Sequence, residues 1–275
     1  MTDRYCVFVD AGYLYKAGGQ ASLNVDDRAS QLLDVESFVP ALSDFCSREV
    51  LGGGGSWLRT YWYDGAPWGN PQPIHEEIGL LPRVKTRIGR LVRDDAGQFQ
   101  QKGVDSLIVR DLVILAERTA ISTAFLLGGD EDLREGVREA QDRGVEVVLL
   151  GIEPPKGSNL SETLVMEADQ LLLVGQEVLG PHFSKPNFST VAPRTTDPYE
   201  FGHRFAEAYV GTLQGFERRV VLRSRRWVPP HIDRAIRQRL SGPSAYGSTG
   251  PDMTSARNGF MQACKSLREA DQAVI

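Results

Sequence analysis

Residues 123–151 read TAFLLGGDEDLREGVREAQDRGVEVVLLG and hold a complete strand–helix–strand unit. The apolar runs 123–127 and 145–150 are typical of buried strands. Between them, a helical spacing from about Asp132 to Arg143 ends at Gly144, a residue suited to stopping a helix. Because two strands joined by a helix pair in parallel through a right-handed crossover, this unit predicts an α/β fold with a mostly parallel sheet.

The first 178 residues continue this alternation of strands and helices. Further strands are expected at Tyr5–Val9, Trp57–Tyr63, 84–92 and Leu171–Val174, and further helices at 34–48, 105–118 and 160–168. The four glycines at 52–55 lack the Gly-Lys-Ser/Thr of a phosphate-binding loop, so they predict a flexible loop. Both faces of the sheet are therefore expected to be covered by helices, as in a three-layer domain.

Four aspartates occupy the ends of these predicted elements. Asp10 follows the strand Tyr5–Val9, Asp130 and Asp132 follow the strand at 123–127, and Asp105 stands at the expected N-cap of a helix. The carboxyl ends of parallel strands meet at one edge of a sheet, where ligands of such sheets bind. We therefore expect the four side chains to form one site.

The chemistry of this site points to a divalent cation. Carboxylates held close together repel one another, and a hard cation removes that penalty. Oxygen ligands without histidine or cysteine favour Mg²⁺ or Mn²⁺, and such sites leave positions for water and a substrate phosphate. Phosphodiester hydrolysis by a metal-activated water is the expected reaction. The structural alternative makes Asp105 and Asp132 helix caps and Asp130 a turn residue.

Charge is distributed unevenly along the chain. The whole chain carries a net charge of −5, but residues 197–275 hold 12 basic and 8 acidic residues. A Pro-, Ser- and Thr-rich stretch at 179–198 predicts a linker, followed by a small helical or winged-helix-like module at 199–275. Its basic residues are candidates for phosphate contacts, although a solvated surface is the ordinary alternative. The five candidates are Arg218, Arg219, Arg223, Arg225 and Arg226.

Other classes of site and location are disfavoured. Three dispersed cysteines suggest neither a disulfide framework nor a zinc site, and the four histidines lack metal-ligand spacing. No apolar stretch approaches the roughly 18 to 20 residues that span a bilayer, and the N-terminus resembles no leader peptide. A cytoplasmic protein without a membrane partner is expected, and association into a homo-oligomer is left open.

Three motifs together resemble a known family. They are VFVDAGYLY at 7–15, QKGVDSLIVRDLV at 101–113 and the stretch at 125–151 described above. They are similar to the NYN-domain proteins, in the LabA-like branch of the PIN-type nuclease superfamily. The resemblance implies a PIN-like domain over residues 1–178, Mg²⁺- or Mn²⁺-dependent nuclease activity and an RNA substrate. By position, Asp10, Asp105, Asp130 and Asp132 match its catalytic and metal-binding acids, and Lys102 matches a basic residue before a helix.

Tyr13 departs from the pattern of the family. Many relatives have asparagine three residues after the first aspartate, and a phenol cannot replace an amide that both donates and accepts in one plane. Tyr13 is a candidate for stacking on an RNA base, or for packing the first helix. Asp111 either supports the acidic cluster or pairs with a nearby arginine.

Three functions follow from these observations. The first is a metal-dependent endoribonuclease whose basic C-terminal module holds RNA. The second is a non-catalytic RNA-binding adaptor on the same scaffold, and the third is a metal-dependent phosphatase or nucleotide hydrolase that acts on small molecules.

Overall fold

The computed structural model of the chain describes residues 3–93, 99–153, 159–191, 195–240 and 250–273. A seven-stranded sheet has the strand order β5-β4-β3-β1-β6-β7-β8. Its strands run parallel except β5, which pairs antiparallel with β4. The strands are β1 (Arg4–Asp10), β3 (Ser56–Pro67), β4 (Val84–Arg93), β5 (Phe99–Lys102), β6 (Thr123–Leu127), β7 (Glu146–Ile152) and β8 (Gln170–Val174). The predicted α/β fold with a mostly parallel sheet is confirmed.

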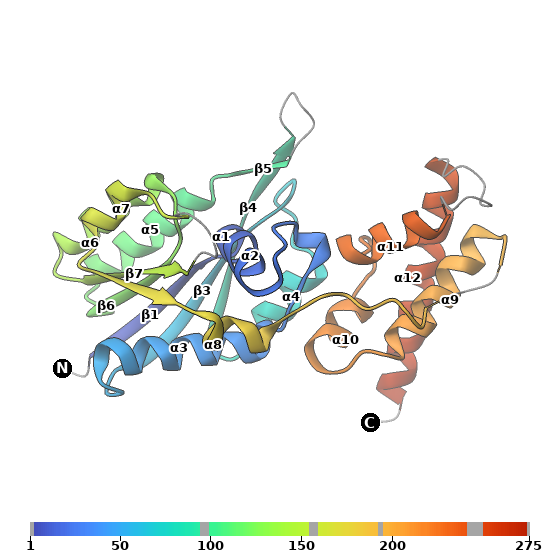
Figure 1. Cartoon of the computed structure of the whole chain (residues 1–275), viewed down its shortest axis with the longest axis horizontal. Coiled ribbons are helices and arrows are strands. Elements are labelled where there is room, and N and C mark those ends of the chain that lie inside the picture. Colours follow the sequence, from blue (N-terminus) through green and yellow to red (C-terminus); the bar gives the residue numbers. More distant parts are fainter. Residues whose placement is uncertain (1–2, 94–98, 154–158, 192–194, 241–249, 274–275) are drawn as a thin grey trace. The chain divides into compact units, whose positions relative to one another are not determined.

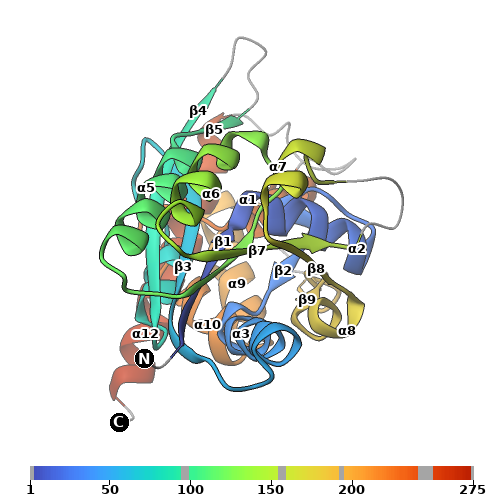
Figure 2. The ribbon, with the colours of Figure 1, turned by 90° about the vertical axis from the view of Figure 1, so that its left-hand side faces the viewer.

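Helices cover both faces of this sheet, as Figures 1 and 2 show. One face carries α3 (Val35–Leu51) and α8 (Gln176–Leu179), and the other carries α5 (Val104–Glu117), α6 (Arg134–Gln141) and α7 (Glu162–Glu167). The first crossover opens with α1 (Ala11–Tyr13), a π-helical turn (Leu14–Gly18) and α2 (Gly19–Leu23). Shorter elements are β2 (Leu32–Leu33), α4 (Pro73–Leu80), β9 (Phe183–Ser184) and 3₁₀ turns at Arg28–Ser30, Glu131–Leu133 and Gly180–His182.

The core of the sheet is built around the central strand β1. Residues 5–9 are buried, because helices cover both faces of this strand. Phe8 stacks on Tyr61 of β3 with ring centroids 5.5 Å apart, and both belong to the cluster that contains Ile108 and Leu112 of α5. Burial of this kind contributes about 25 cal/mol per Å² of apolar surface, so β1 and α5 hold each other in place.

The strand order changes direction beside β1. After β1, the chain builds β3 and β4 on one side, and it then crosses to β6, β7 and β8 on the other side. The order therefore reverses between β1 and β6, and ligands of open parallel sheets bind at the carboxyl ends of strands at such a point. β1 ends at Asp10, and Asp130 lies three residues beyond the end of β6.

Contacts along the chain separate it into two compact units. The first holds residues 1–27, 33–71 and 78–183, and the second holds residues 28–32, 72–77 and 184–275. The second unit contains α9 (Pro198–Val210), α10 (Gly215–Leu222), α11 (Pro230–Leu240) and α12 (Gly250–Ala273). The described residues after 184 form no strand, so the region is helical rather than winged-helix-like.

The basic run around 220–222 indicates a strand by sequence alone, but these residues end α10. Phe216, Val220 and Val221 are all buried, at a spacing that puts them toward one side of a helix. Packing of this side outweighs the preference of valine for strands, which is only a weak guide to structure.

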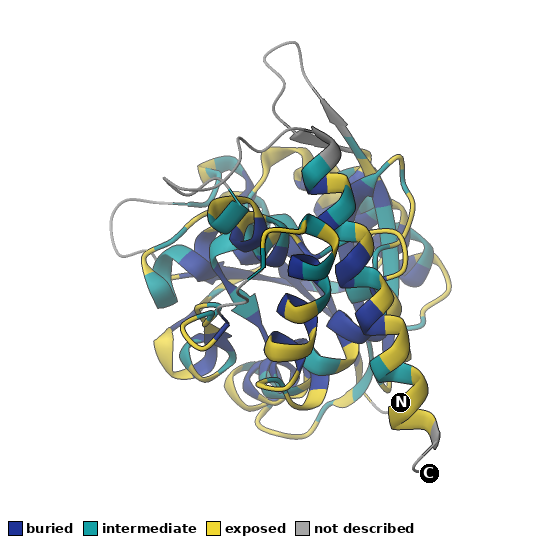
Figure 3. Ribbon diagram, turned by 90° about the vertical axis from the view of Figure 1, so that its right-hand side faces the viewer, coloured by how far each residue is buried: buried dark blue, intermediate teal, exposed yellow. Residues whose placement is uncertain are grey.

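Two glycines let α9 and α12 touch backbone to backbone. A Cβ atom on Gly202 would lie 1.8 Å from the carbonyl oxygen of Ala256, and one on Gly259 would lie 2.0 Å from that of Tyr199. Larger residues would push the helices apart at both points. The remaining buried residues of α12 include Phe260 and Cys264, and Figure 3 shows how buried and exposed residues alternate along the helices of this unit.

Two expectations about composition can be compared with the structure. All three cysteines, Cys6, Cys46 and Cys264, are buried free thiols. Among the helices of the described residues, none combines the length and apolar character needed to cross a bilayer.

His231 makes the stability of the helical unit depend on pH. Its ring packs beside Phe188 and Tyr209, and its Nε2 atom is buried without a hydrogen-bond partner among the described residues. Burial lowers the pKa of His231 from 6.5 to about 4. The unfolded chain therefore binds a proton between pH 6.5 and 4 that the folded chain excludes, and stability falls as the pH falls through this window.

We expect the wild type to lose about 2 to 3 kcal/mol more stability than His231→Phe between pH 7 and 4.5, as measured by urea unfolding. The phenylalanine keeps the ring contacts and cannot titrate. Equal losses in the two proteins would show that His231 is not the responsible group.

Candidate functional site

Asp10 connects the central strand to the first helix. It ends β1 and caps α1, where its Oδ1 accepts a hydrogen bond of 3.3 Å from the Tyr13 amide. Burial raises the pKa of Asp10 to about 6, and the charges of Asp105 and Asp64 raise it further, while the amides of Tyr13 and Gly12 oppose this shift. The carboxylate is therefore held where its ionised form is disfavoured.

Asp105 faces the same group of acids from α5. Its pKa is raised by burial and by the charges of Asp130 and Asp132. The expectation that it caps the helix is wrong. Gly103 is the N-cap, with a φ of 80° that glycine adopts without strain, and Asp105 lies in the first turn. Its carboxylate accepts a hydrogen bond from its own backbone amide, which opposes the rise in its pKa.

Asp130 and Asp132 form the exposed part of the site. Asp130 caps the 3₁₀ turn Glu131–Leu133, and its Oδ1 accepts a hydrogen bond of 3.1 Å from the Asp132 amide. Both residues are solvent-exposed, unlike the half-buried Asp10 and Asp105. The structure thus bears out the turn geometry expected for this segment, with Asp130 rather than Asp132 as the cap.

Electrostatic coupling links the predicted acids into one group. Asp10 interacts with Asp105, and Asp105 interacts with both Asp130 and Asp132. Within the described ranges, no three carboxylate, imidazole or thiolate groups lie close enough together to hold a metal ion by themselves. The donor set still fits Mg²⁺ or Mn²⁺ chemically, because Mg²⁺ commonly binds through one or two carboxylates and keeps several waters.

Asp64 is a fifth acid that the sequence reasoning did not select. It lies in β3 next to Tyr63, which pairs with Asp10, and its side chain is only 1% exposed. Its Oδ1 accepts a hydrogen bond of 2.8 Å from the Gly65 amide, and its charge raises the pKa of Asp10. The sequence did carry a pattern that could have identified Asp64. An acidic residue follows an apolar run of a predicted strand here, as at Asp10.

Tyr13 takes part in a closed ring of hydrogen bonds. Its hydroxyl accepts from the Ile152 amide at 3.0 Å and donates to Asn159 Oδ1 at 2.7 Å. Asn159 Nδ2 in turn donates to the Ile152 carbonyl at 2.9 Å. The ring of Tyr13 packs on Gly129, where a Cβ would lie 2.7 Å from the tyrosine. Tyr13 therefore ties the first helix to the end of β7.

Asn159 places a side-chain amide next to Tyr13, which stands where many relatives have asparagine. The sequence analysis did not select Asn159. No local pattern marks it, because its partners are 7 and 146 residues away in the chain. Burial raises the pKa of Tyr13 to about 12, so its hydroxyl stays protonated and available as a donor at neutral pH.

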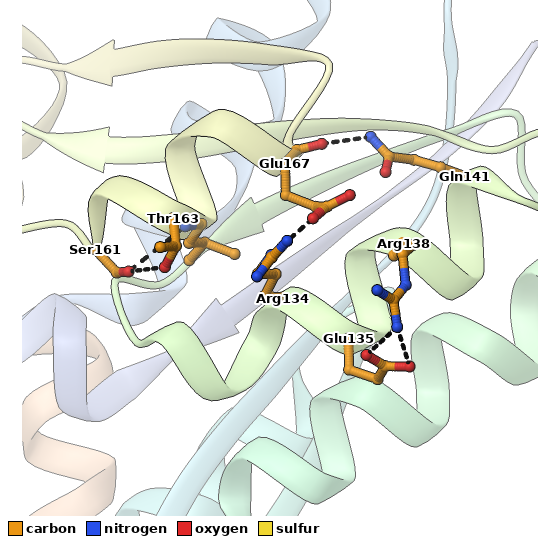
Figure 4. A network of polar contacts seen from close by, with 8 residues as sticks. Arg134, Glu135, Arg138, Gln141, Ser161, Thr163 and Glu167 are labelled. Carbon is orange, nitrogen blue, oxygen red and sulfur yellow. Dashed lines mark hydrogen bonds and ion pairs between the residues drawn. The ribbon is translucent and has the colours of Figure 1, made fainter.

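Figure 4 shows a network of polar contacts around α6 and α7, the two helices that follow the turn of Asp130. Arg134 pairs with Glu167 at 2.7 Å, and Gln141 donates to the Glu167 carbonyl at 2.8 Å. Just before α7, the Ser161 amide donates to the Gly129 carbonyl at 3.0 Å, next to Asp130. The acidic turn is thus anchored from both following helices.

Asp111 pairs with arginine, which was one of its two expected roles. Its Oδ2 accepts from Arg87 Nε at 2.7 Å and from the Tyr63 hydroxyl at 3.2 Å, and its Oδ1 accepts from Arg110 at 3.2 Å. These bonds join α5 to β3 and β4. Since Asp105 lies on the same helix, Asp111 helps to fix its position.

An exposed tryptophan stands at the same edge of the sheet. β3 continues beyond the level of Asp10 to Pro67, and the next residue, Trp68, is 80% exposed with a φ of 58°. An exposed aromatic ring is suited to stacking on a nucleic-acid base. The sequence does not show whether Trp68 is exposed, so Trp68 was not among the predicted site residues.

The predicted basic residues divide into two groups. Arg218 pairs with Asp271 at 2.9 Å and donates to the Val210 carbonyl, while Arg219 and Arg223 both pair with Glu77. The exposed side chains of Arg225 and Arg226 form no ion pair within the described part of the chain. The side chain of Lys102 lies outside the described residues. Three of the five C-terminal arginines are thus engaged inside their own unit.

Comparison with known families matches residues 4–174 to the NYN domain. Since this match spans more than half of the chain, the protein belongs to the NYN-domain family, within the PIN-like nuclease superfamily. Assignment to the LabA-like branch stays a prediction.

Two relatives illustrate the range of similarity. The uncharacterized protein y4oD of Sinorhizobium fredii is 54% identical over 92 residues, which is 34% of this chain and 41% of that protein. A crystal structure of a protein of unknown function from Vibrio parahaemolyticus has a TM-score of 0.44 and 16% identity, covering 64% of this chain and 95% of the other.

Replacing Asp10 tests whether its buried charge, opposed by neighbouring acids, destabilises the fold. The folded state holds a proton on Asp10 up to about pH 6, so its ionisation destabilises the fold as the pH rises from about 4 to 6. In the presence of a chelator at pH 7.5, Asp10→Asn should be more stable than the wild type by up to about 3 kcal/mol.

The difference should nearly disappear at about pH 3, where Asp10 is mostly protonated in both states. Urea unfolding at both pH values measures it, with the exposed surface acid Asp142→Asn as the control. Destabilisation by Asp10→Asn at pH 7.5 would contradict the prediction.

Removing the Tyr13 hydroxyl tests the hydrogen-bonded ring. Tyr13→Phe leaves the Ile152 amide and Asn159 without this partner, which should cost about 1 to 2 kcal/mol of unfolding free energy. Tyr199→Phe is the matched control, because the hydroxyl of Tyr199 has no partner among the described residues. Similar stabilities of the two variants would show that the ring contributes little.

Proposed function

We propose that this protein is a Mg²⁺- or Mn²⁺-dependent endoribonuclease. The observation that carries the proposal is the electrostatic grouping of Asp10, Asp105, Asp130 and Asp132 beside the strand-order reversal of an NYN domain. Hydrolysis of an RNA phosphodiester at this place would leave 5′-phosphate and 3′-hydroxyl ends.

Asp10 and Asp105 are proposed to provide the main metal ligands, because their half-buried carboxylates gain most from a neutralising cation. Asp130 and Asp132, on the exposed turn, would complete the site through water or direct contact. When bound, the cation stabilises negative charge on the phosphate and makes water a better nucleophile at neutral pH.

The other residues of the domain would position this group and the RNA. The Tyr13 amide fixes the rotamer of Asp10. The contacts of Asp111 hold α5, the helix that carries Asp105, against the sheet. Trp68 offers an exposed ring for a base at the same edge of the sheet. The hydrogen-bonded ring around the Tyr13 hydroxyl favours a packing role for this residue rather than base stacking.

Cleavage of a labelled RNA in Mg²⁺ or Mn²⁺ tests the proposal. Asp10→Asn and Asp130→Asn should each lower the rate at least about 100-fold, because each removes charge stabilisation worth several kcal/mol. Asp142→Asn, which removes an exposed acid elsewhere, should cleave as the wild type does. Undiminished cleavage by the Asp10 variant would refute the assignment.

A non-catalytic RNA-binding adaptor is the second candidate. It is favoured by one observation, that Tyr13 replaces the asparagine expected near the first acid and is engaged internally. Salt-dependent RNA binding that survives Asp10→Asn, together with no cleavage in either metal, would select this function.

A further inference from the structure

The helical unit contains a pocket of about 570 Å³ with a basic lining. One face of α12, the start of α9 and the residues just after α10 form its wall. Arg225, Lys265 and Arg268 contribute three positive charges, and among the described residues no acid lines the pocket. A pocket with this charge attracts an anionic ligand.

The three cations differ in how they are held. Arg225 is exposed and has no ion pair among the described residues, and Lys265 lies 4.0 Å from Glu269 in an exposed pair that contributes little. Arg268 donates to the Leu222 carbonyl at 2.8 Å, which fixes the direction of its side chain. Two cations are thus free to move onto a ligand, and the third is held in place.

The neutral lining residues suit a nucleotide. Asn258 and Gln262 lie one turn apart on α12 and offer amide donors and acceptors, while Tyr199 presents a ring that is 40% exposed. Amides read the polar edges of bases, and an exposed aromatic ring stacks on their faces. The volume is large for a lone phosphate and falls in the range of pockets for small organic ligands.

Ser224 gives an independent indication of a ligand. It lines the pocket, is only 1% exposed, and its hydroxyl has no hydrogen-bond partner among the described residues. A buried hydroxyl without a partner costs roughly 1 to 3 kcal/mol. A phosphate oxygen or a base at the wall of the pocket would supply the missing partner.

We infer that this pocket binds one or two nucleotides of a single-stranded RNA, with the cations on phosphate and Tyr199, Asn258 and Gln262 on the base. The choice of RNA rests on the proposed function, but binding in the pocket does not require cleavage. Of the five arginines expected to contact RNA, this assignment selects Arg225 and adds Lys265 and Arg268.

Fluorescence anisotropy with a labelled 12-nucleotide oligouridylate tests the inference. It is measured without divalent metal on full-length Asp10→Asn protein, at 50 and 200 mM salt. Arg225→Ala with Lys265→Ala should weaken binding at 50 mM salt at least about 10-fold. The slope of log K against log salt should become shallower by about 1.4, since each phosphate that the protein no longer neutralises accounts for about 0.7.

Arg226→Ala is the matched control, since this exposed arginine neighbours Arg225 in the sequence but does not line the pocket. It should bind nearly as the parent protein does. Equal losses from Arg225→Ala and Arg226→Ala, or no loss in the double variant, would overturn the inference. Uridine monophosphate should compete only at far higher concentration, and equal competition would overturn an RNA strand as the ligand.

The cleavage assay separates this inference from the proposed function. Loss of binding in the Arg225 and Lys265 variant, in a protein that never cleaves RNA, would keep the pocket and reject the nuclease. Metal-dependent cleavage with unchanged binding in that variant would keep the nuclease and reject the pocket.

Discussion

The position of Asp10 is the constraint on which the rest of the site depends. Its carboxylate ends a strand buried on both faces, where burial disfavours the charge and the charges of Asp105 and Asp64 oppose it. The amides of the first helical turn offset part of this cost. A cation bound beside Asp10 would therefore stabilise the folded protein, because it would neutralise a carboxylate whose charge is disfavoured. This is the general condition for a cation site in a protein.

Much of the first unit could be predicted from local patterns. The residues 123–151 carry their strand, helix and turn signals within one crossover, so both the parallel sheet and the edge that holds the acids followed from the sequence. The role of Gly103 did not follow, and the sequence left two roles open for Tyr13. Gly103 acts through a backbone conformation, and Tyr13 acts through partners that approach only when the sheet is assembled.

The C-terminal arginines show a different limit of sequence reasoning. A count of charges cannot tell a residue that faces solvent from one whose charge is already paired. Arg219 and Arg223 share the carboxylate of Glu77, more than 140 positions earlier in the chain, and Arg218 binds Asp271 near its end. The residues that line the pocket were less conspicuous in the sequence because Lys265 and Arg268 stand apart from the arginine cluster.

The glycine contacts between α9 and α12 affect more than helix packing. Gly259 lies against the carbonyl of Tyr199, and its chain neighbour Asn258 lines the same pocket as Tyr199. Because the two backbones touch, the helices have little freedom to slide or tilt at this point. A ligand that enters between the ring and the amide therefore meets a wall that is already ordered, and little conformational entropy is lost on binding.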